Sequence, residues 1–350
     1  MSTASTTTPR PSEGVRACPR CGAPVARRAP EGGSDRTPDS CDSCGLEWVW
    51  RGGVLDVLAD TRREEAAATV ESFYERSPFP GYAPSETASS LIERSRRSPF
   101  LVAFDRAVPV DGTLLSVGCG TAHVPAFLAV SSRRRRVVGV DGCAASLGVA
   151  DAFARRAEAT NLELVRADLF DLPFPARSFD VVSCRGVVHH TPRPWEATDR
   201  VAEMVAPGGV LLIGIYESLG RAWHRFRMRL ARLRGGPEYG GRPIRALDPV
   251  LRHAGTDEER KRIWEEDQYR HPVEHLMPFT RLLTRLEQQG FEWVRSLPPV
   301  PTGPTSSLFE STPRPGPASM ARLRTGWLLK GPLDPDAGLV FLVARRRHTS

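Results

Sequence analysis

Four cysteines near the start of the chain stand in two pairs whose spacing suits a metal site. Each pair has the form Cys-x-x-Cys followed by glycine, "CPRCG" at residues 18–22 and "CDSCG" at residues 41–45, with nineteen residues between the pairs. Four thiolates close a tetrahedral site, which suits zinc and leaves no open position for a reacting water. A redox pair would not explain the duplication. The pattern predicts one structural Zn(2+), with the ligands Cys18, Cys21, Cys41 and Cys44.

A second set of candidate residues lies where apolar runs end. The run "LLSV" stops at Gly118 and Gly120, and closely spaced glycines let a ligand approach the backbone. The next run, "RRVVGVDG", ends on Asp141, where a carboxylate can accept hydrogen bonds from both hydroxyls of a ribose. A third run ends on Asp168, which could meet an adenine. The candidate cofactor-binding residues are Gly118, Cys119, Gly120, Thr121, Asp141, Gly142, Asp168, Leu169 and, after a fourth run, Arg185.

The elements that must position these residues alternate between strand and helix. Apolar segments at 113–117, 137–141, 162–166, 179–184, 210–216, 291–297 and 339–344 predict strands. Such alternation is typical of a doubly wound α/β fold, in which ligands bind beyond the carboxyl ends of parallel strands. Before the sheet we expect one helix that starts at Thr61, with Glu64 completing a capping box, and a second amphipathic segment at 87–107.

Together these motifs resemble the class I S-adenosylmethionine-dependent methyltransferases, in particular the type 11 and type 12 domains. "LLSVGCGTA" is similar to the glycine motif, "VVGVDG" to the ribose-binding acid, "RADLFDLPFPARSFDVV" to the adenine loop and fourth strand, and "APGGVLLIGIY" to the fifth strand. The resemblance implies a Rossmann-like seven-stranded sheet of order 3-2-1-4-5-7-6 and S-adenosyl-L-methionine as cofactor. Two positions depart from the family: Ser116 replaces an acid, and Ala122 replaces the third glycine.

The rival interpretation of the glycine turn is a nicotinamide or flavin site. Such cofactors carry a pyrophosphate, and their fingerprint needs three glycines that open a helix. The third position of that pattern is His123 here. The turn therefore fits a cofactor without phosphate better than a dinucleotide.

Candidate catalytic residues follow the fourth and fifth strands. Methyl transfer is an in-line displacement that depends mainly on positioning, so a base is optional. His189 and His190 could take a proton from the acceptor, or could merely orient their loop, and Tyr216 could hold the acceptor or simply end its strand. "ESFYERSPFPGY" could lay Tyr74, Phe79 and Tyr82 over the cofactor, or pack them as core.

The motifs divide the chain into four predicted regions. We expect a disordered tail at 1–15, a zinc ribbon at 16–60, a helical cap at 61–110, and the methyltransferase domain at 111–350 with a lid insertion at about 217–280. No apolar run is long enough to cross a bilayer and no signal peptide is evident, so we expect a cytoplasmic protein without a membrane partner.

Charge bears on the acceptor. Residues 217–247 carry eight arginines and two acids, close to the whole net charge of +7, which suits either a lid over a small-molecule site or a grip on phosphates. The first alternative is a methyltransferase for a small metabolite, with the ribbon as a folding or homodimer module. The second is a zinc-ribbon RNA base methyltransferase, and a third is a cofactor-binding scaffold without turnover. We favour the first, because the ribbon itself is neutral and no Asn/Asp-Pro-Pro-aromatic motif follows the fourth strand.

Overall fold

The computed structural model describes residues 15–26, 39–58, 69–70, 72, 74–75, 81–83, 85–235, 247–252, 258–301, 307–331 and 338–348. Its central feature is a sheet whose strands coincide with the seven apolar segments of the sequence. These strands are β6 (Thr113–Val117), β7 (Arg136–Asp141), β8 (Leu162–Arg166), β9 (Phe179–Arg185), β10 (Val205–Tyr216), β11 (Phe291–Leu297) and β12 (Leu339–Arg346).

The order of these strands is that of the predicted methyltransferase sheet. Neighbours run β11-β12-β10-β9-β6-β7-β8, and β12 is antiparallel to both strands beside it. The pairs β9-β10, β6-β9, β6-β7 and β7-β8 are parallel. The expected order 3-2-1-4-5-7-6 is therefore confirmed, and the carboxyl ends of β6, β7, β8 and β9 meet at one edge.

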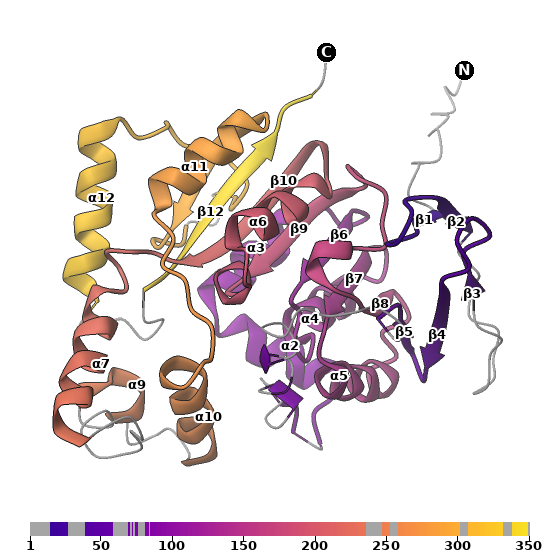
Figure 1. The fold of residues 1–350 in the computed structure, drawn as a ribbon, viewed down its shortest axis with the longest axis horizontal. Coiled ribbons are helices and arrows are strands. Elements are labelled where there is room, and N and C mark those ends of the chain that lie inside the picture. Colours follow the sequence, from indigo (N-terminus) through magenta and orange to yellow (C-terminus); the bar gives the residue numbers. More distant parts are fainter. Residues whose placement is uncertain are drawn as a thin grey trace.

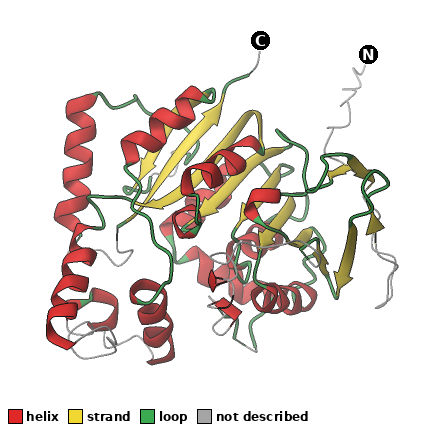
Figure 2. Cartoon of the chain, viewed as in Figure 1, coloured by secondary structure: helices red, strands yellow, loops and turns green. Residues whose placement is uncertain are grey.

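Both faces of the sheet are covered by helices (Figures 1 and 2). Consecutive strand residues point to opposite faces, so Leu114 joins one hydrophobic cluster and Leu115 the other. The Leu114 side packs against α2 (Ala88–Arg96), α3 (Pro99–Ala107), α4 (His123–Ser131) and α5 (Ala144–Arg156). The Leu115 side packs against α6 (Pro194–Glu203), α11 (Phe279–Gln288) and α12 (Pro317–Lys330). Two short 3-10 turns, η1 (Leu169–Asp171) and η2 (Val188–His190), follow β8 and β9.

Three of the five N-terminal strands join this sheet, and the other two form a separate two-stranded sheet. Strands β1 (Val15–Ala17) and β2 (Pro24–Ala26) pair with each other, and β3 (Asp39–Ser40), β4 (Glu47–Arg51) and β5 (Val54–Asp56) form an antiparallel series. Strand β5 also pairs in parallel with β8, which makes a ten-stranded sheet. The β4-β5 hairpin lies within the predicted ribbon, and its attachment to the main sheet is a feature that the sequence did not indicate.

The cap segment differs from expectation at one point. Residues 87–107 form two helices, because Pro99 starts α3 and the Ser98 hydroxyl accepts a hydrogen bond from the Leu101 amide. Proline at the first helical turn and serine before it favour a new helix over continuation of the old one. Helix α2 begins with a capping box of Thr87 and Ser90. The capping box expected at Thr61 and Glu64 lies outside the described residues.

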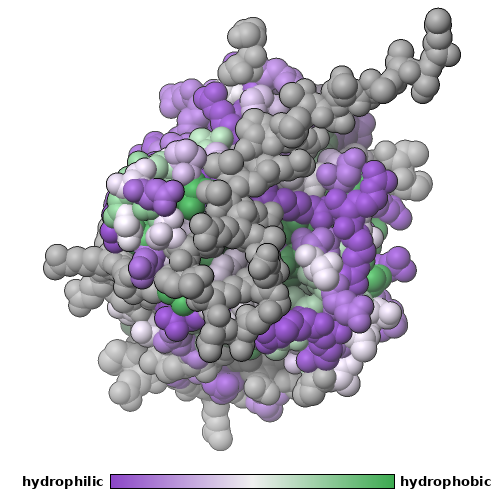
Figure 3. Space-filling model, turned by 90° about the vertical axis from the view of Figure 1, so that its right-hand side faces the viewer, coloured by the Kyte–Doolittle hydropathy of each residue, from purple (hydrophilic) through white to green (hydrophobic). Residues whose placement is uncertain are grey.

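The insertion between β10 and α11 contributes α7 (Ala222–Gly235), α9 (Pro249–Arg252) and α10 (Glu258–Tyr269). These helices gather at the opposite end of the molecule from the N-terminal hairpins (Figure 1). The face that carries the hairpins exposes mostly hydrophilic residues where its described atoms are visible (Figure 3). Within the described part of the chain, no helix combines the length and the apolar character needed to cross a bilayer.

Candidate functional site

The four predicted metal ligands come together in two turns of the same design. In each turn the amide of the glycine donates to the carbonyl of the first cysteine at 2.8 Å, Gly22 to Cys18 and Gly45 to Cys41. Both glycines have positive φ, +73° and +70°, a backbone conformation that other residues rarely adopt. The matching turns present Cys18, Cys21, Cys41 and Cys44 to one point, with all four sulfurs within 4.8 Å of one another.

These sulfurs fit a tetrahedral ion. Cys18 Sγ lies 3.5 Å from Cys44 Sγ, and Cys21 Sγ lies 3.6 Å from Cys41 Sγ. Thiolates at about 2.3 Å from a tetrahedral zinc stand about 3.8 Å apart, which is close to both distances. The donor set is the all-thiolate set of structural zinc sites.

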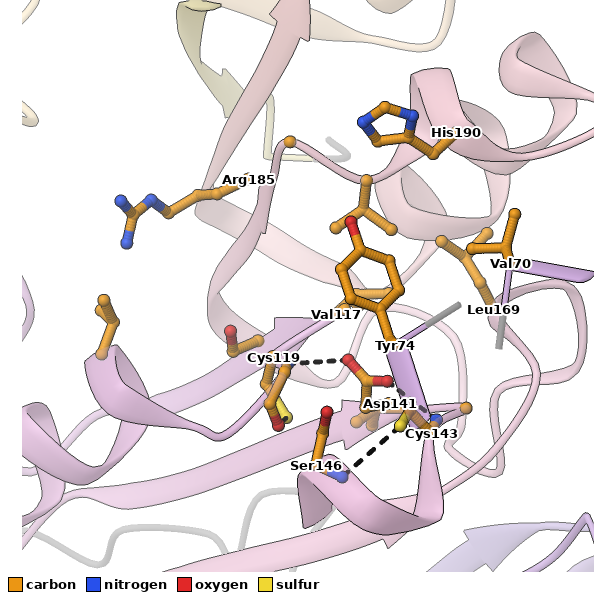
Figure 4. Close-up of a pocket in the computed structure, with 18 of the residues that line it drawn as sticks. Val70, Tyr74, Val117, Cys119, Asp141, Cys143, Ser146, Leu169, Arg185 and His190 are labelled. Carbon is orange, nitrogen blue, oxygen red and sulfur yellow. Dashed lines mark hydrogen bonds between the residues drawn. The ribbon is translucent and has the colours of Figure 1, made fainter. Parts of the chain in front are cut away.

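The second site is a cavity of about 580 Å³ at the carboxyl ends of the parallel strands. Its walls come from the turn after β6, the tips of β7, β8, β9 and β10, the cap and α10. Figure 4 shows Cys119 and Asp141 toward one end, His190 toward the other, and Tyr74 between them. Among the predicted cofactor and catalytic residues, those that line the cavity are Gly118, Cys119, Gly120, Asp141, Gly142, Asp168, Leu169, Arg185, His190 and Tyr216.

The turn after β6 depends on glycine for two reasons. Gly118 has φ +65°, and a Cβ at this position would lie 2.3 Å from Val187 Cγ2. Ala122, which stands at the third glycine position of the family motif, has φ +56° and directly precedes α4. A left-handed alanine is strained, which explains why glycine is common there. Thr121 is fully buried behind the turn and does not line the cavity.

Asp141 is held by the loops on either side of it. Its Oδ2 accepts from the Gly120 amide at 2.7 Å, and its Oδ1 accepts from the Cys143 amide at 2.9 Å. Burial raises the pKa of this carboxyl group, and the backbone hydrogen bonds oppose that shift. Each oxygen keeps acceptor capacity for a further hydrogen bond, so the carboxylate can receive two hydroxyls from the cavity.

The other predicted cofactor residues take different positions around the cavity. Asp168 caps η1, because its Oδ1 accepts from the Phe170 amide at 2.9 Å. The Arg185 guanidinium lies over the Phe100 ring, with Cζ 4.8 Å from the ring centroid, and its side chain points away from Asp141 (Figure 4). The binding roles of these residues stay predictions.

The two adjacent histidines separate into a buried one and a lining one. His189 has no exposed surface, does not line the cavity, and accepts from the Tyr216 amide through Nδ1 at 3.3 Å. His190 lines the cavity, and its Nδ1 lies 2.7 Å from the Val273 carbonyl oxygen. A carbonyl can only accept, so Nδ1 of His190 carries the proton and Nε2 carries the lone pair.

Burial keeps both histidines neutral. Desolvation lowers the pKa of His190 to about 4, although the hydrogen bond to Val273 opposes the shift. Desolvation, followed by the nearby His190 and Arg221, holds the pKa of His189 well below its usual range. His190 is therefore an unprotonated imidazole at neutral pH with its lone pair available, which is the state a general base needs.

Tyr216 belongs to a polar network that the sequence did not indicate. Its hydroxyl accepts from Gln268 Nε2 at 2.8 Å, and Gln268 Nε2 also donates to Asp267 Oδ2 at 2.7 Å. The Tyr74 hydroxyl donates to Asp267 Oδ1 at 2.9 Å. Desolvation raises the pKa of Tyr216, so its phenol stays protonated at neutral pH. The network joins the cap, β10 and α10 across the cavity.

One arginine of the basic segment supports this network from behind. Arg221 is fully buried, donates to Gln268 Oε1 at 2.7 Å and forms an ion pair with Glu274 at 2.6 Å. Its guanidinium lies 3.6 Å from the centroid of the Tyr216 ring. The cavity wall in this region is α10, with Trp264, Asp267 and Gln268, and no described residue of α7 lines it. The lid insertion expected at about 217–280 therefore reaches the cavity through α10, whereas the described arginines of its basic part do not line the cavity.

The aromatic segment before the glycine motif also divides. Tyr74 lines the cavity, whereas Tyr82 stacks on Phe153 of α5 at a centroid distance of 4.0 Å. Phe79 lies outside the described residues. No short motif marked Asp267 or Gln268, because they follow Tyr216 by about fifty residues in a segment without a recognisable pattern. The available signal for these two polar lining residues was an acid next to an amide on a helix that is otherwise mainly charged.

Comparisons with known proteins agree with this geometry. Residues 115–213 match the family described as "Methyltransferase domain". The chain is 27% identical to an uncharacterized chloroplastic methyltransferase of Arabidopsis thaliana, over 57% of this chain and 60% of the relative. It is 30% identical to the 27-O-demethylrifamycin SV methyltransferase of Amycolatopsis mediterranei, over 38% of this chain and 49% of the relative. It is 32% identical to the erythromycin 3''-O-methyltransferase of Saccharopolyspora erythraea, over 55% of this chain and 64% of the relative.

The chain thus covers less than two thirds of the length of each of these relatives. The matched family segment contains the glycine turn, Asp141, Asp168 and the tip of β9, and it ends before the tip of β10. It excludes the N-terminal hairpins and α10. The shared part is therefore the set of parallel strands from β6 to β10 with its cofactor edge, and residues 115–213 of this chain carry a methyltransferase domain of the class I S-adenosylmethionine-dependent type.

Proposed function

We propose that the protein transfers a methyl group from S-adenosylmethionine to a hydroxyl group of a small molecule. The observation that carries the proposal is Asp141, a carboxylate fixed by the Gly120 and Cys143 amides at the strand tip where a ribose is expected. Bound S-adenosylmethionine would supply an electrophilic methyl group on sulfur. Asp141 would hold the ribose, Asp168 and Leu169 the adenine, and the turn at 118–120 the amino-acid portion.

The acceptor would occupy the other half of the cavity. Its walls there are Tyr74, Trp264, Asp267, Gln268, Tyr216 and His190. The cavity volume of about 580 Å³ falls within the roughly 300–1,000 Å³ of small-molecule sites. Walls contributed by three separate segments would surround an acceptor on several sides, which favours a small molecule over a polymer.

His190 is the proposed general base. Its neutral imidazole presents Nε2 while Val273 holds Nδ1, so the ring can accept the proton of an acceptor hydroxyl without rotating. The hydroxyl oxygen would attack the methyl carbon as the carbon–sulfur bond breaks, with the bonding electron pair left on sulfur. Tyr216 would donate its hydroxyl proton to the acceptor, since that oxygen already accepts from Gln268. His189 would orient this pair from behind.

Charge favours a neutral or cationic acceptor. Among the described lining residues, Arg185 is the one permanent cation, and its guanidinium lies over the Phe100 ring. Asp267 faces the acceptor half and would repel a carboxylate or phosphate. The names of two relatives denote O-methylation, of a demethylrifamycin and at the 3'' position of erythromycin. These support a hydroxyl as the acceptor group.

The experiment uses the purified chain with S-adenosylmethionine that carries an isotopic label on the methyl group. Small-molecule and RNA fractions of a cell extract are incubated separately and analysed by mass spectrometry, with the Asp141→Ala variant as control. We expect label in a hydroxyl-containing small molecule. Label in a base of RNA instead would establish the alternative, an RNA methyltransferase, and cofactor binding without label in either fraction would indicate a scaffold.

We also propose that Cys18, Cys21, Cys41 and Cys44 hold one structural zinc ion. The support is the pair of matching turns and the sulfur separations of 3.5 and 3.6 Å. Elemental analysis of protein purified without added metal tests this. We expect one zinc per chain, lost in Cys41→Ser and retained in Cys119→Ser, because Cys119 lies in the cavity turn. Full zinc occupancy in Cys41→Ser would contradict the ligand set.

A cytoplasmic location and a homodimer stay predictions. Cell fractionation would test the location, and light scattering would test the oligomeric state.

A further inference from the structure

A row of three charged residues crosses the sheet from the N-terminal hairpin to the cofactor edge. Asp56 of β5 pairs with Arg166 of β8, and Arg166 pairs in turn with Asp141 of β7. The three strands are adjacent and parallel, so these residues lie side by side at the carboxyl ends of their strands. The first residue of the row comes from the β4-β5 hairpin, whose strand β5 lies beside β8 (Figure 1), and the last is the proposed ribose ligand.

The Arg166 side chain connects the two ends of the row. Its Nη1 donates to Asp56 Oδ2 at 3.0 Å, and its Nε donates to the Gly142 carbonyl at 3.0 Å. The planar guanidinium fixes the relative position of two acceptors more rigidly than a flexible ammonium can. The contact therefore sets the distance between the hairpin and the loop that follows Asp141.

The loop at Gly142 controls the orientation of the Asp141 carboxylate. The Cys143 amide, directly after Gly142, donates to Asp141 Oδ1 at 2.9 Å. A shift of the Gly142 carbonyl would therefore turn the amide that orients the carboxylate. Hydroxyl recognition by two oxygens needs such orientation, since hydrogen bonds weaken steeply when misaligned.

Asp56 is built into the hairpin as a charged group. It has no exposed surface, its Oδ1 accepts from the Leu58 amide at 3.0 Å, and its Oδ2 also accepts from Arg51 Nε at 3.1 Å. An apolar pair would cover the edge of the sheet at least as favourably as a buried ion pair. What the ion pair adds is a directed link to the Gly142 loop. Leu58, two residues later, lines the cavity itself.

We propose that Asp56 is a positioning residue for the cofactor, acting through Arg166 and the Gly142 loop on Asp141. The N-terminal module would then complete the cofactor site in addition to covering the edge of the sheet. This inference rests on the proposed use of Asp141 as the ribose ligand.

The test measures binding of S-adenosylmethionine to the full chain by calorimetry. We expect Asp56→Asn to weaken binding by about 5- to 30-fold, as for the loss of one charge-assisted hydrogen bond. The matched control is Arg51→Gln, which removes the exposed partner of the same carboxylate and should leave affinity within about twofold. Arg166→Lys keeps the charge but cannot span both acceptors, so it should weaken binding as Asp56→Asn does.

A second readout separates positioning from general damage to the fold. Wild-type protein should prefer 5′-methylthioadenosine over its 2′,3′-dideoxy analogue, and Asp56→Asn and Arg166→Lys should both reduce that preference. Preserved affinity and preserved preference in both variants would overturn this inference alone. Failure of the wild type to bind S-adenosylmethionine, or full affinity in Asp141→Ala, would overturn the proposed function and this inference with it.

Discussion

The two halves of the cavity are built in different ways. The cofactor half consists of turns that directly follow consecutive strands, and its key carboxylate, Asp141, is held by backbone amides. The acceptor half consists of side chains from remote segments, and its polar groups hold one another, as Tyr74, Asp267 and Gln268 do. The first half depends on the sheet, whereas the second depends on the cap and the insertion.

This difference separates what the domain shares from what is specific to this chain. The matched family segment, residues 115–213, contains the cofactor half but ends before Tyr216 and α10. Backbone-held groups need only the correct turns, so a short motif can specify them. Side chains that are held by one another come from several segments of the chain. A different insertion can therefore replace them without altering the cofactor edge.

The largest effect is expected from removal of the Asp141 carboxylate in the cofactor half. Asp141→Ala deletes two proposed hydrogen bonds to the ribose, so the Kd for S-adenosylmethionine should rise about 30- to 1000-fold by calorimetry. The control is Asp180→Asn. Asp180 lies at the amino-terminal end of β9, away from the cavity, and its carboxylate accepts a hydrogen bond from the Thr113 amide at 2.8 Å, so this variant should keep the wild-type Kd. Equal affinities for Asp141→Ala and wild type would assign Asp141 a purely structural role in its turn.

Substitutions in the acceptor half should lower turnover and leave the affinity for the cofactor unchanged. His190→Gln keeps a hydrogen-bonding side chain but removes the base, so kcat should fall about 100-fold while the Kd for S-adenosylmethionine stays within twofold. Stopped assays on the acceptor identified by methyl labelling measure this. His224→Gln serves as control, because His224 is buried beside Tyr269 and does not line the cavity. Unchanged kcat in His190→Gln would leave positioning alone as the source of catalysis.

Acid should lower the stability of the folded protein through histidines that burial keeps neutral. Burial lowers the pKa of His190 and of His271 to about 4, from a usual value near 6.5. Between these values the unfolded chain binds protons that the folded chain does not, so the free energy of unfolding should decrease as pH falls from about 6.5 to 4. Each such histidine contributes at most about 1.4 kcal/mol per pH unit.

Denaturant titrations at several pH values check this expectation. The His190→Gln variant should lose less stability than wild type over the same interval, because one of the groups that must stay neutral is gone. An identical pH dependence in both proteins would mean that His190 is not held neutral by the fold.

The smallest effect is expected from the exposed arginines of α7. Arg225 and Arg229 are exposed and do not line the cavity. Replacing both with glutamine should change kcat/KM for a small acceptor by less than about twofold, in line with weak surface electrostatics. Binding to a structured RNA at several salt concentrations is the complementary measurement. Submicromolar, steeply salt-dependent binding that is lost in this variant would favour a polymer acceptor.

Sequence reasoning reached the sheet and the cofactor half because their signals are local. Gly118 and Asp141 stand directly at the ends of apolar runs, and strand order followed from a resemblance carried by four short motifs. It missed the division between α2 and α3, although Ser98 and Pro99 form an ordinary helix start. The signal for a new helix was present in the sequence, but the amphipathic pattern was interpreted as one continuous segment.

Other features left no local signal to find. The pairing of Leu55 with Val165 joins two short apolar segments far apart in the chain, and either segment could pair elsewhere. The burial of Arg221 could not be told from an exposed arginine in the same basic run, because it depends on Glu274 and Gln268 meeting it in space. Contacts of this kind are set by tertiary packing, and composition and periodicity do not encode them.

The attachment of β5 to β8 also bears on the order in which the chain assembles. The β4-β5 hairpin joins neighbours in sequence and can form as soon as residue 56 is available, whereas its partner strand begins at Leu162. Closing a loop of that length is slow compared with closing a hairpin. During synthesis from the N-terminus, strand β5 of the hairpin therefore keeps one unpaired edge until β8, the third strand of the domain, has been synthesised. A hairpin that can form early therefore docks only after about a hundred further residues have been added to the chain.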